Sequence, residues 1–127
     1  MHQSRLAGII IDCNTDNLDR EARFWGQALG YGIRPSDDPD DANYVILDTP
    51  QGEPYIEVQS VDHPSRVHLD IKTDDVEAEV RRLEKLGAKR IRKFDRWWVM
   101  EAPSGHRFCV VALRPGQDFG ELRSWDE

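Results

Sequence analysis

Residues 10–29 read IIDCNTDNLDREARFWGQAL, and residues 68–87 read HLDIKTDDVEAEVRRLEKLG. The two stretches share one pattern at an offset of 58 residues. Asp12 and Asp70 each stand in an apolar, strand-like run, and a Thr-Asp pair follows three residues later in both copies. The apolar positions of the following segments also correspond, Leu18, Ala22 and Trp25 matching Val76, Val80 and Leu83. This agreement predicts a duplicated fold built from two units of about 55 residues.

The first half predicts a strand, a helix and two further strands. Leu6–Cys13 is rich in β-branched residues, which favours a strand. A helix over Asp16–Leu29 has Asp16 as its N-cap and ends at Gly30, where a left-handed residue is wanted. The remaining expectations are a surface loop over Ser36–Asp41, a turn at Pro50–Gly52, and strands over Asn43–Asp48 and Pro54–Ser60.

The second half repeats this order. Asp74 with Glu77 predicts a capping pair for a helix over Asp75–Leu86, which buries Val76, Val80, Leu83 and Leu86 and ends at Gly87. Strands are expected over Arg66–Lys72, Ala88–Lys93, Trp97–Ala102 and Arg107–Leu113. We therefore predict one domain with modules over residues 6–62 and 65–114 and a tail over 115–127. Trp125 in that tail is a candidate anchor against the body or a partner.

Composition excludes several classes of protein. The formal net charge of -7 argues against nucleic-acid binding, because phosphates require basic surfaces. No apolar run approaches the ~20 residues of a membrane span, and the first residues contain no signal-peptide core. Cys13 and Cys109 stand in apolar runs outside any CxxC motif, which indicates two reduced cysteines in a cytoplasmic protein.

Three stretches carry a resemblance to a known family: RFWGQALGY at 23–31, RVHLDI at 66–71 and APSGHRFCV at 102–110. Together with the duplicated βαβββ order, they resemble the vicinal-oxygen-chelate superfamily over about residues 6–113, and its glyoxalase-like, bleomycin-resistance-like subgroup of small bacterial proteins in particular. The resemblance implies an α+β fold in which duplicated βαβββ modules form a curved mixed sheet. It leaves the activity open, because this fold hosts isomerases, epimerases, oxygenases and binding proteins.

The same resemblance implies four positions for metal ligands, one on the first and one on the last strand of each half. Here these positions are Ile10, Glu57 (or Gln59 if the register shifts by two), His68 and Cys109. Ile10 cannot bind a metal, and Cys109 stands where the family has a carboxylate. We therefore expect no tightly bound metal and no cofactor. A degenerate metal site with Glu57 and His68 as ligands is the alternative.

Strand alternation groups the candidate site residues. If His68 points to the concave side of the sheet, Asp70 and Asp12 do so too. We expect His68 and Glu57 to be catalytic, and the ligand-binding residues to be Asp12, Gln59, Asp70, Trp98 and Cys109. Grouped acids raise one another's pKa, which suits acid–base chemistry. In the structural alternative, Asp12 and Asp70 are a symmetric hydrogen-bonding pair and His68 is a hydrogen-bonded histidine lining the pocket.

These observations predict a protein that binds a small organic molecule without metal, with lyase- or isomerase-type acid–base chemistry. The alternatives are a metal-dependent lyase or isomerase and a binding protein that sequesters a drug. We also expect a homodimer, because the open sheet edges of this fold need covering.

Overall fold

The computed structural model describes residues 1–35, 42–116 and 120–126. The predicted loop over Ser36–Asp41 therefore lies outside the described residues. The chain divides into two compact units, each containing one helix. The α1 unit is Gly8–His68, and the α2 unit comprises Met1–Ala7 together with Leu69–Glu127.

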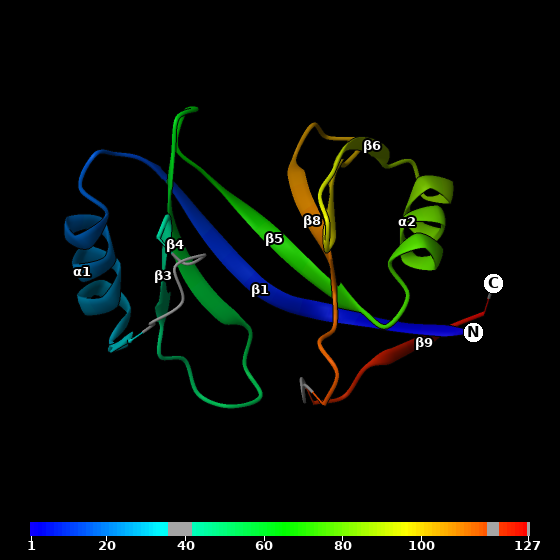
Figure 1. Cartoon of the computed structure of the whole chain (residues 1–127), viewed down its shortest axis with the longest axis horizontal. Coiled ribbons are helices and arrows are strands. Elements are labelled where there is room, and N and C mark those ends of the chain that lie inside the picture. The colour runs from blue at the N-terminus through cyan, green and yellow to red at the C-terminus, as the bar shows by residue number, and fades with distance from the viewer. Residues whose placement is uncertain (36–41, 117–119, 127) are drawn as a thin grey trace. The chain divides into compact units, whose positions relative to one another are not determined.

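The α1 unit follows the order strand, helix and three strands (Figure 1). Its elements are β1 (His2–Asn14, from Gly8 onward), α1 (Leu18–Leu29), β2 (Ile33–Arg34), β3 (Tyr44–Leu47) and β4 (Tyr55–Val61). β1 pairs parallel with β4, whereas β3 runs antiparallel to both β4 and β2. Helix α1 covers one face of this sheet, and its Ala22 forms a core with Ile11, Cys13, Leu47 and Val58 of the strands.

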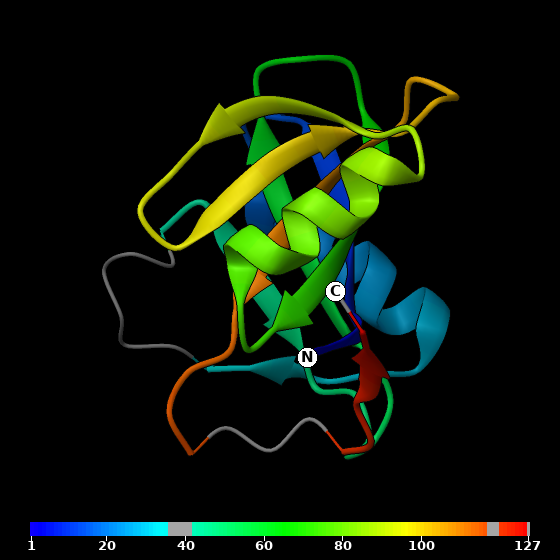
Figure 2. The same ribbon diagram turned by 90° about the vertical axis from the view of Figure 1, so that its right-hand side faces the viewer.

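The α2 unit has the same order of elements. They are β5 (Arg66–Thr73, from Leu69 onward), α2 (Val76–Lys85), β6 (Lys89–Lys93), β7 (Trp97–Glu101) and β8 (Arg107–Ala112). β5 pairs parallel with β8, as β1 does with β4, and β7 runs antiparallel to both β8 and β6. Helix α2 lies across these strands (Figure 2), and its Val80 forms a core with Met100 and Val110 of the sheet. The predicted α+β fold of duplicated βαβββ modules is confirmed.

The repeat extends to the helix caps, but both predicted caps are wrong by one residue. Asn17 caps α1 and accepts from the N–H of Arg20, and Asp75 caps α2 and accepts from the N–H of Ala78. A threonine hydroxyl two residues earlier accepts from the N–H of each cap residue, which fixes the turn. The predicted cap Asp74 instead accepts from the N–H of Gln3, and Glu77 pairs with Arg90.

The leucine at the carboxyl end of each helical segment is exposed, although Leu86 was predicted to be buried. Leu29 is 44% exposed and Leu86 is 68% exposed. Gly30 adopts the predicted left-handed conformation with φ 80°, and Gly87 does so directly after Leu86 with φ 111°. The chain leaves each helix there, so the last leucine of each apolar stripe lies beyond the packed surface.

The two ends of the chain pair with each other in the α2 unit (Figure 1). β1 starts at His2, earlier than the predicted Leu6, and its first residues run antiparallel to β9 (Arg123–Trp125). The indole Nε1–H of Trp125 donates to the hydroxyl of Ser4 at 2.8 Å. Trp125 is therefore the anchor against the body that the sequence indicated. No helix among the described residues is long and apolar enough to cross a membrane.

Candidate functional site

The α1 unit has a face turned away from its helix, which we call the open face. Ile11, Cys13 and Val58 point to the α1 side, so the alternate residues of the same strands point the other way. The strand register sets Ile10 beside Glu57 and Asp12 beside Gln59. Three of the candidate site residues, Asp12, Glu57 and Gln59, therefore lie together on the open face.

Gly8 also lies on the open face and is paired with Tyr55. A Cβ built on Gly8 would stand 2.0 Å from the Tyr55 ring, so the ring lies directly over this glycine. Any larger residue at position 8 would displace the aromatic side chain. Because Gly8 has no side chain, the Tyr55 ring can lie over it on the open face.

His68 and Asp12 form a hydrogen-bonded pair within the α1 unit, which we call the Asp12–His68 dyad. Nδ1 of His68 lies 2.6 Å from Oδ2 of Asp12. The Asp12 side chain is 2% exposed and the His68 side chain 15% exposed. An ionised carboxylate only accepts, so Nδ1 carries the hydrogen and the basic lone pair of the neutral ring is on Nε2.

The second oxygen of Asp12 is an exception to the usual pairing of buried polar atoms. Oδ1 is buried and has no hydrogen-bond partner among the described residues. Arg66 is the only other charged contact of this carboxylate in the described part of the α1 unit, with Nε 4.0 Å from Oδ2. Asp12 is therefore a buried acceptor that the fold leaves incompletely satisfied, unlike the symmetric structural pair considered for Asp12 and Asp70.

Asp70 and Cys109 are neighbours in the α2 unit, where the β5–β8 register pairs them. Asp70 is 9% exposed and Cys109 is partly buried. Lys72, also on the Asp70 side of β5, is buried at 8% exposure and was missed by the sequence analysis. The sequence did not reveal this burial, because a lysine in an alternating strand is usually exposed to solvent.

Trp98 and Cys109, both expected to bind the ligand, lie on opposite faces of the sheet, since Trp98 is paired with Val110 and Cys109 with Val99. It packs against the core of Val80, Met100 and Val110 beneath α2, and Arg90 lies 5.1 Å from its ring centroid. Trp97 occupies the opposite side of β7. The sequence analysis placed Trp98 among the ligand-binding residues, whereas this packing puts its ring on the α2 side of the strand.

The buried thiol of Cys13 lies on the α1 side, away from the open face. Burial first, and then the nearby Glu21 and Asp12 carboxylates, raise the pKa of Cys13 above its ordinary value. A thiol with a raised pKa forms little thiolate, so Cys13 is a core residue without nucleophilic character.

Of the four metal positions implied by the family, Ile10, Glu57 and His68 lie in the α1 unit and Cys109 lies in the α2 unit. Ile10 is buried at 2% exposure and offers no donor atom. His68 already uses Nδ1 for Asp12, and Glu57 is the remaining donor at these positions within the α1 unit. These positions therefore offer Glu57 and His68 as donor side chains in the α1 unit and Cys109 in the α2 unit, and Ile10 offers none.

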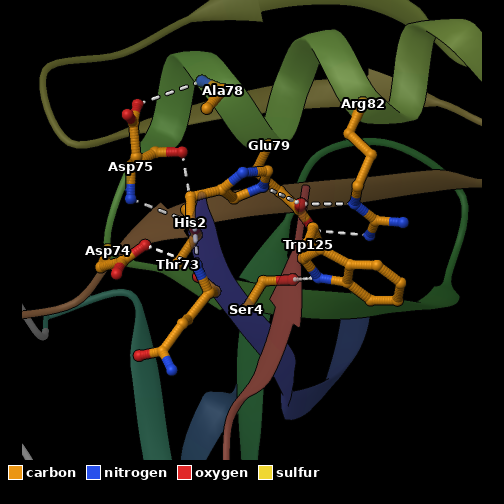
Figure 3. Close-up of polar contacts among 10 residues, drawn as sticks. His2, Ser4, Thr73, Asp74, Asp75, Ala78, Glu79, Arg82 and Trp125 are labelled. Atoms are coloured by element: carbon orange, nitrogen blue, oxygen red, sulfur yellow. Dashed lines mark hydrogen bonds and ion pairs between the residues drawn. The ribbon is translucent and has the colours of Figure 1, made fainter. Parts of the chain in front are cut away.

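A second buried histidine lies in the α2 unit and was not foreseen (Figure 3). Nε2 of His2 lies 2.8 Å from Oε1 of Glu79, and both side chains are almost fully buried. Arg82 donates to both oxygens of Glu79, from Nε at 2.7 Å and Nη2 at 2.8 Å. Its guanidinium stacks 3.8 Å from the Trp125 ring centroid. The only signal in the sequence was the Glu79–Arg82 spacing of one helical turn.

Burial alone would raise the pKa of Glu79, but hydrogen bonds from Arg82, His2 and Ser4 outweigh it. The pKa of Glu79 is therefore lowered. Glu79 is charged, and both of its oxygens have partners. The contacts among His2, Glu79, Arg82 and Trp125 therefore connect α2 to both ends of the chain. We call these contacts the Glu79 network.

The chain matches one family model and is similar in fold to several solved structures. The family model of the glyoxalase-like domain matches residues 8–111. A hypothetical protein from Bacillus halodurans C-125 has a similar structure, with a TM-score of 0.63, 14% identity, and coverage of 91% of this chain and 98% of that one. No curated protein matches the sequence significantly.

Two methylmalonyl-CoA epimerases are also similar in structure. The Mycobacterium tuberculosis enzyme has a TM-score of 0.61 and 16% identity, covering 87% of this chain and 88% of that one. A Streptomyces coelicolor epimerase, in complex with 2-nitronate-propionyl-CoA, gives the same TM-score and identity and covers 87% and 97%. At this identity the likeness shows the fold alone.

Proposed function

We propose a function for this chain from one established fact: it belongs to the glyoxalase-like domain family, in the vicinal-oxygen-chelate superfamily. The chain binds a small organic molecule on the open face of the α1 unit, and His68 transfers a proton to or from it. The observation that carries this proposal is the 2.6 Å contact between Nδ1 of His68 and Oδ2 of Asp12.

The dyad supports this chemistry through its tautomer. Asp12 accepts the Nδ1–H of His68, and so makes Nε2 the basic atom of the neutral ring. When Nε2 takes a proton, the adjacent carboxylate stabilises the imidazolium that forms. The partial exposure of His68 lets the ring meet a ligand, whereas the buried Asp12 holds its orientation. His68 is thus suited to be a general base and, after protonation, a general acid.

Glu57 is our second catalytic candidate, because it shares the open face with the dyad. A carboxyl group there could accept or return the proton on the other side of the bound molecule. Gln59, beside Asp12 in the register, is proposed to bind ligand oxygen or nitrogen atoms. Asp70 and Cys109 remain proposed ligand contacts. Trp98 is withdrawn from this set because of its place in the core.

The reaction class we favour is isomerase- or lyase-type proton transfer at a carbon next to a carbonyl. Several structures of the same fold are of methylmalonyl-CoA epimerases, and an epimerase must invert a stereocentre. A single base of imidazole type beside a carboxylate suits removal of such a proton. The dyad supports this reaction class, and the fold likeness does not name a substrate.

We propose that this chemistry needs no metal, because the implied ligand positions include Ile10 and Cys109. We further propose a cytoplasmic homodimer. Light scattering that finds a monomer at micromolar concentration would contradict the dimer.

The test is exchange of the α-hydrogen of candidate substrates in deuterated water. A panel of 2-oxo acids and acyl thioesters is incubated with the wild type and with His68→Gln, and exchange is followed by proton NMR. At least one compound should exchange faster with the wild type and lose this acceleration with His68→Gln. His106→Gln is the control, because His106 is an exposed histidine that contacts Ser104 in the other unit. Equal exchange with all three proteins would refute the proposal.

A further inference from the structure

We infer that Arg66 is the carboxylate-binding residue of the open face, so that the molecule bound beside the dyad is a monoanionic carboxylic acid. This inference rests on the proposed function for the location of the ligand. It adds a chemical class of ligand and a positioning residue that neither the family resemblance nor the sequence patterns supplied.

Arg66 is placed beside the dyad by the strand itself. It begins β5 two residues before His68, and residues two apart in a strand point to the same face. Nε of Arg66 lies 4.0 Å from Oδ2 of Asp12, the oxygen that also accepts from His68. This distance gives an electrostatic contact but no hydrogen bond.

A second contact orients the guanidinium. Nη2 of Arg66 lies 3.4 Å from Nε2 of His63, and Nδ1 of His63 lies 2.9 Å from the carbonyl oxygen of Pro64. Because a carbonyl only accepts, the hydrogen of the neutral His63 ring is on Nδ1, and its Nε2 can accept from Arg66. His63 therefore holds one end of the guanidinium.

Arg66 has donors to spare. A guanidinium carries five N–H groups, and the Arg66 side chain is 45% exposed. Apart from the His63 contact, no hydrogen bond joins it to a described residue. A carboxylate matches the planar fork of this group with two parallel hydrogen bonds.

The charges near the dyad favour a monoanion. The Asp12 side chain is only 2% exposed. Its negative charge would repel an anionic ligand next to His68. Arg66 is the only cation within ion-pair distance of Asp12 in the described part of the α1 unit, and it offsets this charge. One guanidinium can offset the charge of Asp12 but cannot also neutralise a phosphate dianion. A carboxylate leaves the smaller excess of negative charge.

Asp12 supplies an independent sign that the site is completed by another molecule. Its Oδ1 is a buried acceptor without a partner among the described residues. Such an oxygen costs stability unless a donor reaches it. A hydroxyl, an amide or a water bound with the ligand is the kind of donor that would complete the partners of this oxygen.

The test uses propionate, its neutral isostere propionamide and inorganic phosphate as probes. Binding is followed by the NMR signals of the Arg66 Nε–H and the His68 ring. Propionate should bind about tenfold or more tightly than propionamide, as expected for charge-assisted bonds. Arg66→Gln should abolish this preference, and Arg66→Lys should keep part of it because the charge remains without the fork.

Arg34→Gln is the matched control, because Arg34 is a half-exposed arginine of the same unit, paired with Asp48. It should leave propionate binding unchanged. Equal binding of propionate and propionamide, retained preference in Arg66→Gln, or tighter binding of phosphate than of propionate would each overturn the inference.

One further variant separates this inference from the proposed function. His68→Gln should lose proton exchange but still bind propionate through Arg66. Loss of carboxylate binding in Arg66→Gln without any exchange activity in the wild type would support the binding residue and contradict only the proton transfer.

Discussion

In the described part of the chain, each of the two units holds a histidine–carboxylate pair, and the two pairs have similar lengths but different settings. In the α1 unit, His68 lies 2.6 Å from Asp12, and in the α2 unit, His2 lies 2.8 Å from Glu79. Both carboxylates are buried almost completely. The pairs differ in what else surrounds the carboxylate.

Glu79 is satisfied on both oxygens, by two hydrogen bonds from Arg82 and one contact with His2 (Figure 3). Asp12 has one oxygen without a partner among the described residues and a distant arginine with unused donors. A complete network stabilises and orders the fold, whereas an incomplete one keeps acceptors and donors for a ligand. This difference assigns a structural role to His2 and a functional one to His68.

The largest effect is expected from Glu79→Ala. It leaves Arg82 and His2 without their buried partner, so the free energy of unfolding should fall by about 3–5 kcal/mol. Urea denaturation measures this change. The control is Glu77→Ala on the same helix, whose half-exposed carboxylate pairs with Arg90 and should contribute less than about 1 kcal/mol. Equal losses from the two variants would contradict the structural role of the network.

Asp12→Asn should act on chemistry more than on stability. The amide cannot hold the Nδ1–H tautomer as the carboxylate does, so the exchange accelerated by His68 should fall by about 100-fold. The free energy of unfolding should change little, because the variant removes a buried charge that lacks a full set of partners. A variant that unfolds but exchanges normally in its folded fraction would reverse the roles of the two pairs.

Trp125→Ala tests the carboxyl-terminal side of the Glu79 network. It removes the hydrogen bond to Ser4 and the stacking of Arg82, which together should contribute about 2 kcal/mol. Amide hydrogen exchange should accelerate at residues 2–4, which pair with β9. Unchanged protection there would show that β9 is held by its backbone alone.

The lowered pKa of Glu79 predicts a pH dependence of stability with a definite sign. Arg82, His2 and Ser4 outweigh burial and lower the folded-state pKa below the ordinary value of 4.5. Glu79 therefore stabilises the fold above pH 4.5, and this contribution is lost as the pH falls through the folded-state pKa. The difference in unfolding free energy between wild type and Glu79→Gln should shrink below pH 4.5. A difference that grows on acidification would contradict the charge state assigned to Glu79.

The smallest effect on exchange activity is expected from removal of metal ions. Protein purified without chelator should contain no stoichiometric transition metal, and a chelator should leave the exchange activity unchanged. Elemental analysis and exchange rates check both statements. If zinc, nickel, manganese or iron is found, Glu57 and His68 are the first residues to test as ligands.

The duplicated fold could be predicted from the sequence because each weak local pattern occurs twice, at the same offset. The apolar stripes, the threonine before each helix and the strand aspartates recur at one offset, and the structure keeps that offset for both helix starts, Leu18 and Val76. The caps were misplaced by one residue in both halves, because adjacent polar residues such as Asp74 and Asp75 satisfy the same local rule.

The site was only partly predictable. Alternation along strands put Asp12 and His68 on one face, but their direct contact depends on twist and side-chain rotamers. Arg66 and Glu79 were not selected, because an arginine at a strand start and a glutamate in a helix are ordinary surface residues in sequence. Two short elements, β2 and β9, also escaped prediction. Their few residues lack a period, and pairing partners far along the chain define them.

The most direct test of the two roles is the nitrogen-15 NMR spectrum of the histidine rings. In their neutral forms, His68 should carry its hydrogen on Nδ1, toward Asp12, and His2 on Nε2, toward Glu79. Of these two rings, only His68 should change its signals when propionate is added. A His68 ring protonated on Nε2, or a propionate response at His2 instead of His68, would contradict the assignment of the functional pair.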